Sequence, residues 1–337
     1  MGWHAQVQIT ELDPTDPAAR RAWHEALVTA VRADRPHALT TTLEAFEVVA
    51  TAPSQHFARS WLQAVVDGEV VGTAELELPL SENTEVAWTE VAVLPGHRRR
   101  GIGRALWDAV VVRARDAGRS RIGGEVTLDL DVAGPGQDFA GAVGAVEMHR
   151  EDHLVAHLPV AAALVDPAYE VVRWRGRCPD EHRTAYLAMR NQMNADVPTG
   201  DLDVEAAVLD DTRLVDSEER LMRSYDVRVA AARRRTDGLF GGYSLMFVPH
   251  GADYGWQDDT LVMPEHRGRR LGAALKAANY ADLPEHVTLV HTWTDPDNAA
   301  MHRTNTGLGF RVVERMLEME VALDADLDVD PDVGARA

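Results

Sequence analysis

Two arginine- and glycine-rich segments of the chain could each hold a phosphate group. The first is Arg98-Arg99-Arg100-Gly101-Ile102-Gly103-Arg104, and the second is Arg267-Gly268-Arg269-Arg270-Leu271-Gly272-Ala273. Each follows a short apolar run and a proline and opens an apolar-periodic stretch, which predicts a strand, a loop and a helix start. Free backbone N–H groups at the start of a helix bind anions, and the flanking arginines add positive charge. The sequence therefore predicts two equivalent anion sites.

This internal repeat sets the predicted architecture, because the elements around each segment also recur in the same order. We expect an α/β (α+β) fold with two tandem domains, each a mixed central sheet flanked by helices. The predicted domains are residues 1–160 and 165–323. Residues 324–337 form an acidic tail with few apolar residues, which we expect to be disordered.

Local signals place several elements within this plan. Asp16-Pro17 predicts a helix start, and Asp67-Gly68 between two apolar runs predicts a β-hairpin. Residues 56–66 are predicted to be helical. Asn298 to Leu308 is predicted as a helix that ends at Gly309.

The bulk properties exclude several classes of protein. A chain of 337 residues with a net charge of −20 repels nucleic acid, so we expect no nucleic-acid partner. No apolar run is long enough to span a membrane, and the N-terminus does not resemble a signal peptide. The single cysteine, Cys178, excludes an intramolecular disulfide and a cysteine-based metal cluster. We expect a cytoplasmic protein, monomeric or homodimeric, with no membrane partner and no metal.

The first segment fits the pattern Arg/Gln-x-x-Gly-x-Gly and resembles the coenzyme A pyrophosphate loop of the GNAT superfamily of N-acetyltransferases. A β-hairpin, a strand and Pro95 precede it, as in that family, whereas the features of a P-loop or a dinucleotide-binding loop are missing. The resemblance implies acetyl-CoA as cosubstrate. It implies coenzyme A contacts in the first half at Val91, Val93, Arg98, Arg99, Arg100, Gly101, Ile102, Gly103 and Arg104.

The second segment departs from the pattern, because Arg270 stands where the first glycine belongs. Further on, Asn298, Asn305 and Gly309-Phe310 resemble the GNAT segment Asn-x-x-Ala-x-x-x-Tyr-x-x-x-Gly-Phe, with Asn305 at the tyrosine position. Asparagine cannot act as the acid that this tyrosine often provides. The resemblance implies coenzyme A contacts in the second half at Val262, Arg267, Gly268, Arg269, Arg270, Leu271, Gly272, Ala273 and Asn298.

The resemblance also implies a pair of candidate catalytic carboxylates, Glu90 and Asp259, which lie at equivalent places in the two halves. In this family an acid here often acts as general base for the attacking amine. A backbone N–H near Val93 or Val262 would polarise the thioester carbonyl. Because the second half alone has Asn298 with the Gly309-Phe310 ending, we expect it to hold the acceptor.

The chain as a whole resembles tandem-domain GNAT proteins that are common in actinobacteria. This implies transfer of an acetyl group from acetyl-CoA to a primary amine of a small molecule. Direct attack in a ternary complex is expected, because Cys178 lies outside both predicted sites. The alternative is a non-catalytic acyl-CoA-binding or regulatory protein with degenerate domains, which the missing tyrosines favour and the two carboxylates oppose.

Overall fold

The structure is a computed structural model that describes residues 7–52, 54–130 and 132–323. The two halves repeat one order of elements. The first half contains β1 (Gln8–Glu11), α1 (Pro17–Arg32), α2 (Leu43–Thr51), β2 (Phe57–Val66), β3 (Glu69–Pro79), β4 (Val86–Val93), the 3-10 turn η1 (Pro95–His97), α3 (Ile102–Asp116), β5 (Arg121–Asp129), α4 (Pro135–Ala142) and β6 (Val146–His157). The predicted tail, 324–337, lies outside the described residues.

The second half follows the same order. It contains β7 (Tyr169–Arg175), α5 (Asp180–Asp196), α6 (Asp211–Met222), β8 (Tyr225–Arg234), β9 (Phe240–Pro249), β10 (Tyr254–Val262), the 3-10 turn η2 (Pro264–His266), α7 (Leu271–Tyr280), β11 (Leu289–Thr294), α8 (Ala299–Leu308) and β12 (Arg311–Ala322). The expected tandem α/β architecture is therefore confirmed.

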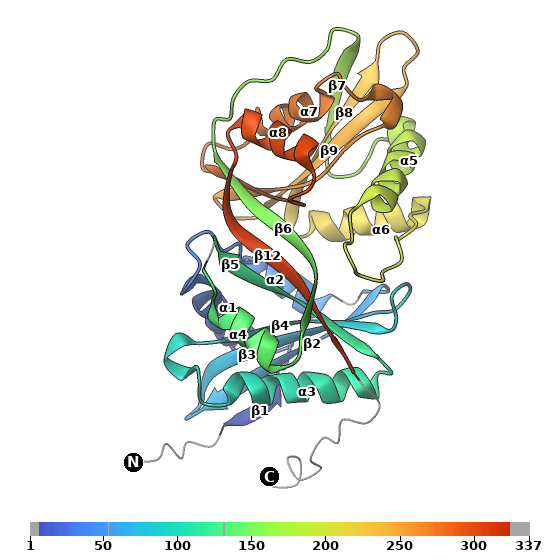
Figure 1. Ribbon diagram of the computed structural model, residues 1–337. Coiled ribbons are helices and arrows are strands. Elements are labelled where there is room, and N and C mark those ends of the chain that lie inside the picture. Colours follow the sequence, from blue (N-terminus) through green and yellow to red (C-terminus); the bar gives the residue numbers. More distant parts are fainter. Residues whose placement is uncertain (1–6, 53, 131, 324–337) are drawn as a thin grey trace.

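All twelve strands join one sheet, in the order β1-β2-β3-β4-β5-β12-β6-β11-β10-β9-β8-β7. The final strand of each half sits in the middle, where β12 pairs antiparallel with both β5 and β6, and β6 pairs with β11. Figure 1 shows β6 and β12 running side by side from one half into the other. The two halves thus exchange their last strands, and each half's sheet is completed by the other.

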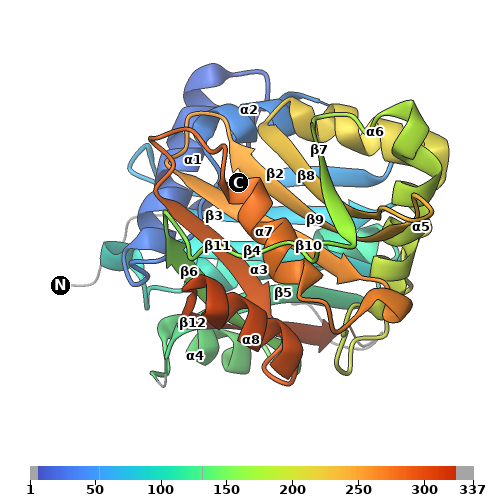
Figure 2. The same cartoon turned by 90° about the horizontal axis from the view of Figure 1, so that it is seen from above.

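Helices cover both faces of the sheet. In the first half α3 packs on β2, β3 and β4 through Leu106 and Val110, while Trp23 of α1 stacks on Phe46 of α2 on the other face. In the second half α7 covers β8, β9 and β10, as Figure 2 shows from above. The apolar stripe of each amphipathic helix is buried on the sheet.

Two local predictions are confirmed and one is wrong. Asp16 caps α1 by accepting a hydrogen bond from the Ala18 N–H, and Asp67 and Gly68, with φ of 51° and 84°, form the predicted turn between β2 and β3. The segment 56–66 was expected to be a helix, but Phe57–Val66 is strand β2. Its residues pair with β3 on one side and β1 on the other, so long-range pairing overrides the local pattern.

Candidate functional site

In both halves two parallel strands pair briefly and then diverge. Strand β4 pairs with β5 only as far as Trp88↔Gly123, and β10 pairs with β11 only as far as Trp256↔His291. The strands continue beyond these pairs without further ladder pairing between them. We call the space between the diverging ends the first opening (β4 and β5) and the second opening (β10 and β11). The N-terminus of α3 or α7 follows each.

The loop before α3 has the backbone shape that an anion site needs. Gly101 caps α3 with φ of 83°, a left-handed conformation that glycine adopts without a steric cost, and no atom lies within 4 Å of where its Cβ would be. Arg98 supports this loop, because its Nε donates to the Val93 carbonyl over 3.0 Å and its guanidinium pairs with Asp34. Arg104 pairs with Asp108 along the helix. The loop therefore presents backbone N–H groups rather than the Arg98 charge.

The loop before α7 has nearly the same backbone with different residues. Arg267 repeats the role of Arg98, donating from Nε to the Val262 carbonyl over 3.1 Å. Arg270 caps α7 in the left-handed region with φ of 56°, which costs a residue with a Cβ about 1 kcal/mol. Arg269 pairs with Asp166. The N–H groups of α7 remain at the loop, but the Arg270 side chain starts where the first loop has open space.

The other predicted contact residues differ in what they present. Ile102 and Leu271 are buried in the cores, so only their main chains could meet a ligand, and Val91 and Val93 pack partly on the first core. Gly272 has only ordinary van der Waals room beside Thr260. Asn298 caps α8, its side chain accepting from the Met301 N–H. The contacts of these residues with a ligand stay predictions.

The first opening is accessible. Glu90 on β4 and Glu125 on β5 are both exposed, yet the surrounding protein desolvates their carboxylates. Both side chains are therefore accessible from solvent, while nearby protein groups weaken the hydration of their carboxylates. Burial, followed by the charges of Glu75 and Glu125, raises the pKa of Glu90 to about 7. A carboxyl that titrates near neutral pH is well matched to general-base catalysis.

Glu90 belongs to a row of carboxylates that we call the acidic face. Glu75 is the cross-strand partner of Glu90, and Glu318 of β12 is the partner of Glu125. Burial and neighbouring carboxylates raise the pKa values of Glu151 and Glu318 to about 7. Like charges this close repel, so the face favours a bound cation. Sequence analysis identified only Glu90; alternate carboxylates along the strands were the signal for the rest.

The second opening is filled by the protein's own side chains. Lys276 of α7 and Asn305 of α8 are fully buried there, with Nζ donating to Oδ1 over 2.7 Å, and Asn305 Nδ2 donates to Thr294 Oγ1 over 3.0 Å. Thr292 Oγ1 donates to the Gln257 carbonyl over 3.1 Å, which links β11 to β10 beyond their last ladder pair. This buried polar network leaves the second opening without the accessibility of the first.

A β-bulge distinguishes β10 from β4. The pairing of β10 with β9 shifts register between Gln257 and Thr260, whereas β4 pairs with β3 without a shift. The bulge lies at Asp258 and Asp259, so two consecutive carboxylates stand where β4 has Glu90.

The predicted base Asp259 is already engaged. Its Oδ2 accepts a hydrogen bond of 2.7 Å from Tyr243 Oη and lies 3.3 Å from Arg190 Nε. Asp258, by contrast, is desolvated by burial, and the charge of Asp259 adds to this, which raises the pKa of Asp258 to about 7. The structure thus keeps Asp259 in an ion pair, while Asp258 titrates near neutral pH.

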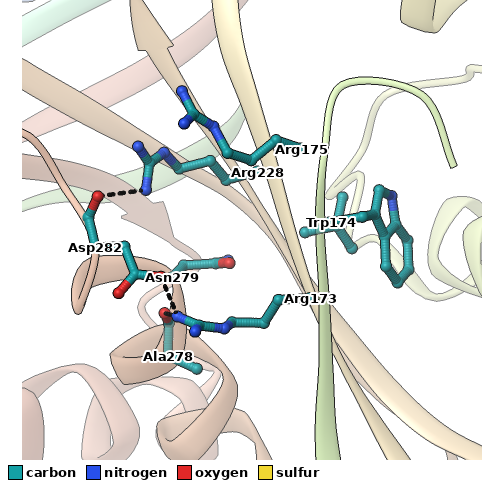
Figure 3. A pocket seen from close by; sticks show the side chains of 8 residues that line it. Arg173, Trp174, Arg175, Arg228, Ala278, Asn279 and Asp282 are labelled. Atoms are coloured by element: carbon teal, nitrogen blue, oxygen red, sulfur yellow. Dashed lines mark hydrogen bonds and ion pairs between the residues drawn. The ribbon is translucent and has the colours of Figure 1, made fainter.

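A separate cavity of about 470 Å³ lies at the outer edge of the second half, beside β7 and the end of α7. In Figure 3, Arg173 and Arg228 point towards the end of α7, while Trp174 lies on the other side of β7. Arg173 pairs with Asp282, and Arg228 donates to the Asp282 carbonyl over 2.9 Å. These arginines are already paired, and the cavity is lined by none of the predicted site residues.

Two further findings concern metal ions and membranes. No group of three or more His, Cys, Asp or Glu residues among them could hold a metal ion. No helix in the described part of the chain is long and apolar enough to cross a membrane.

Comparison with known proteins agrees with this geometry. Residues 20–133 match the Acetyltransferase (GNAT) family. A tandem GNAT protein from the clavulanic acid biosynthesis pathway is 26% identical, with a TM-score of 0.79 over 95% of this chain and 99% of that one. A GCN5-related N-acetyltransferase from Sphaerobacter thermophilus shares the fold at 15% identity, with a TM-score of 0.67 over 96% and 98%. No curated protein sequence matches the chain. Residues 20–133 form a GNAT acetyltransferase domain, and the chain is a tandem-domain protein of the GNAT superfamily.

Proposed function

We propose that the chain transfers an acetyl group from acetyl-CoA to a primary amine of a small molecule, and that its first half carries out the transfer. The observation that carries this proposal is the difference between the openings. Glu90 is exposed on β4, the strand that leads to the Gly101 loop, whereas Lys276 and Asn305 of the second half are buried and hydrogen-bonded to each other. This difference supports an acceptor site in the first half, whereas the sequence favoured the second half.

The residues of the first half fit acetyl-CoA. The space beside Gly101 leaves its loop open to a pyrophosphate, which the N–H groups at the start of α3 would hold. The half-buried side chains of Val91 and Val93 provide an apolar wall for the pantetheine arm. The N–H of Val93 remains the candidate donor to the thioester carbonyl.

The acidic face fits a cationic acceptor. An amine reaches the site mainly as an ammonium ion, which the carboxylates around Glu90 attract. Glu90, directly or through water, takes one proton, and the amine nitrogen then attacks the thioester carbon. The C–N bond forms and the C–S bond breaks. The acylated nitrogen gives up its second proton to solvent, and the coenzyme A thiolate leaves and takes a proton from solvent. The tyrosine position holds Ala140 in α4, so no side chain is assigned as the acid.

The lack of an assigned acid for the thiolate favours the second candidate function, a non-catalytic acyl-CoA-binding protein. Asn305 and Ala140, at the tyrosine positions of the two halves, both lack an acidic proton that could be transferred to a thiolate. In that case acetyl-CoA would bind to the first half without turnover of any amine.

Matched variants of the two halves test the proposal. Gly101→Glu adds bulk and negative charge at the proposed phosphate site and should weaken acetyl-CoA binding at least 10-fold by calorimetry, while Gly272→Glu should change it little. Glu90→Gln should lower kcat/KM on a panel of primary amines by roughly 100-fold, and Asp259→Asn by much less. The opposite ranking of Glu90 and Asp259 would move the chemistry to the second half. Tight binding without turnover would support the non-catalytic alternative.

A further inference from the structure

A chain of buried hydrogen bonds joins the two halves at the centre of the sheet. Arg35, between α1 and α2, donates from Nε and Nη2 to the two carboxylate oxygens of Glu314, each over 3.1 Å. Glu314 Oε2 lies 2.8 Å from His153 Nδ1, and His153 Nε2 lies 2.9 Å from His291 Nδ1. Glu314, His153 and His291 are all buried. Since Glu314 belongs to β12, the last strand of the second half fixes an arginine of the first.

The Glu314 carboxylate is a firm anchor for this arginine. Burial acts to raise its pKa, but the hydrogen bonds from His153 and Arg35 outweigh burial and lower the pKa to about 2. Glu314 therefore stays ionised, and a bidentate pair with a guanidinium fixes orientation as well as distance. His153 is held in turn by stacking on Trp293, with ring centroids 4.5 Å apart.

The anchor of Arg35 lies on the acidic face. Glu314 and Glu318 are four residues apart in one unshifted register with β5, so they point to the same face of the sheet, and Glu318 pairs with Glu125. The groups whose charges act on Glu90 come from three elements packed around it: Glu75 of β3, Glu125 of β5 and Arg35. Both glutamates disfavour the ionised form of Glu90, whereas Arg35 favours it, and Arg35 acts in the same sense on Glu125. Among the charged groups that act on Glu90, Arg35 carries the positive charge. Its position therefore affects how readily Glu90 can serve as a base.

We propose that Arg35 is a positioning residue for Glu90, held over the acidic face by Glu314, so that the second half completes the site of the first. This inference rests on the proposed role of Glu90. It gives the exchange of β6 and β12 a function, because the ion pair that places Arg35 exists only when β12 lies in the sheet of the first half. The second half then contributes to the reaction without binding acetyl-CoA.

A purely structural role makes a different prediction, and the chain offers a matched control. Arg213 of α6 makes a bidentate ion pair with Glu82, and this pair also joins the two halves. The Arg213 side chain is 21% exposed, close to the 23% of the Arg35 side chain. Arg213 is not among the charges that act most strongly on Glu90. If the Arg35 pair only ties the halves together, Arg35→Gln and Arg213→Gln should have the same effects.

The test is a direct titration of Glu90 in the full chain. Protein labelled with ¹³C at the glutamate carboxyls is titrated by NMR, and the Glu90 signal is identified by its absence in Glu90→Gln. Arg35→Gln should raise the Glu90 midpoint by on the order of half a pH unit, because it removes a charge that stabilises the carboxylate. Arg213→Gln should leave the midpoint unchanged, and Arg35→Lys should restore most of it. An unchanged midpoint in Arg35→Gln overturns the inference.

Two further measurements separate the parts of the argument. The effect of Arg35→Gln should be smaller in a Glu314→Gln background, and an equal effect in both backgrounds overturns the positioning by Glu314. That double variant also leaves no unpaired Glu314 charge, so it preserves the test if Arg35→Gln alone fails to fold. The acid limb of kcat/KM should move to higher pH with the midpoint. A limb that stays fixed while the midpoint moves contradicts the proposed role of Glu90, not its coupling to Arg35.

Discussion

Lys276, the chain's single lysine, should make the protein more stable as the pH rises from 7 to 9. Its side chain is fully buried, and burial lowers the pKa from 10.5 to about 7. Between these values the unfolded chain binds a proton that the folded chain does not, so stability increases with pH. The protonation penalty on folding is about 4 kcal/mol at pH 7 and about 2 kcal/mol at pH 9.

The test compares how much the free energy of unfolding changes between pH 7 and pH 9 in the wild type and in a variant without the lysine. Urea unfolding of the wild type and of Lys276→Met at pH 7 and pH 9 should show that the wild type gains about 2 kcal/mol more than the variant. The variant also leaves Asn305 Oδ1 without its donor, but that cost does not depend on pH and cancels. Asn305→Asp should remove most of the gain, because a buried carboxylate would stabilise the ammonium. Equal pH dependence in wild type and Lys276→Met would mean that Lys276 reaches water, and the second opening would then not be filled.

Three further predictions concern the loops, the thiol and the junction between the halves. Gly101→Ala should lower stability by about 1 kcal/mol, because alanine pays for a left-handed φ, and Arg270→Gly should raise stability by a similar amount, both measured by urea unfolding. Cys178 is buried and burial raises its thiol pKa to about 12, so it should resist Ellman's reagent in the folded protein at pH 8, and Cys178→Ser should keep full amine acetylation. Tyr254→Phe removes the 2.8 Å hydrogen bond to the Thr40 carbonyl across the halves and should cost about 1 kcal/mol in thermal unfolding.

Local backbone signals predicted much of the fold. The cap at Asp16, the turn at Asp67-Gly68 and the helix from Asn298 all depend on side chains that satisfy nearby backbone groups, so the sequence around them is sufficient. The segment Phe57–Val66 shows the limit, because its state depends on partners in β1 and β3. The exchange of β6 and β12 between the halves is still harder to predict from the sequence. Strand periodicity indicates which face of a strand is buried but does not identify the neighbouring strand.

The sequence predicts where the candidate carboxylates lie along the strands, but not which side chains surround and engage them. Glu90 and Asp259 lie beside the diverging strands in equivalent places, as the repeat predicts. What decides their chemistry comes from elsewhere: Arg190 of α5 engages Asp259, and Arg35 and Glu314 meet from opposite ends of the chain. The pair that fills the second opening, Lys276 and Asn305, comes from two different helices. Contacts of this kind follow from tertiary packing, which no single motif contains.

The two loops show how one backbone can have two different uses. Each loop needs two left-handed positions, and each has one glycine for them: Arg99 and Gly101 take these positions in the first half, and Gly268 and Arg270 in the second. The arginine and the glycine swap positions between the two loops, and the path of the backbone is preserved. The cost in conformational energy is similar, because each loop contains one arginine in the left-handed region. The swap also moves the residue without a side chain away from the helix N-terminus, where a phosphate must approach closely. A repeat in sequence therefore predicts equal folds, while the place of a single glycine separates an uncrowded helix N-terminus, where we propose the anion site, from a crowded one.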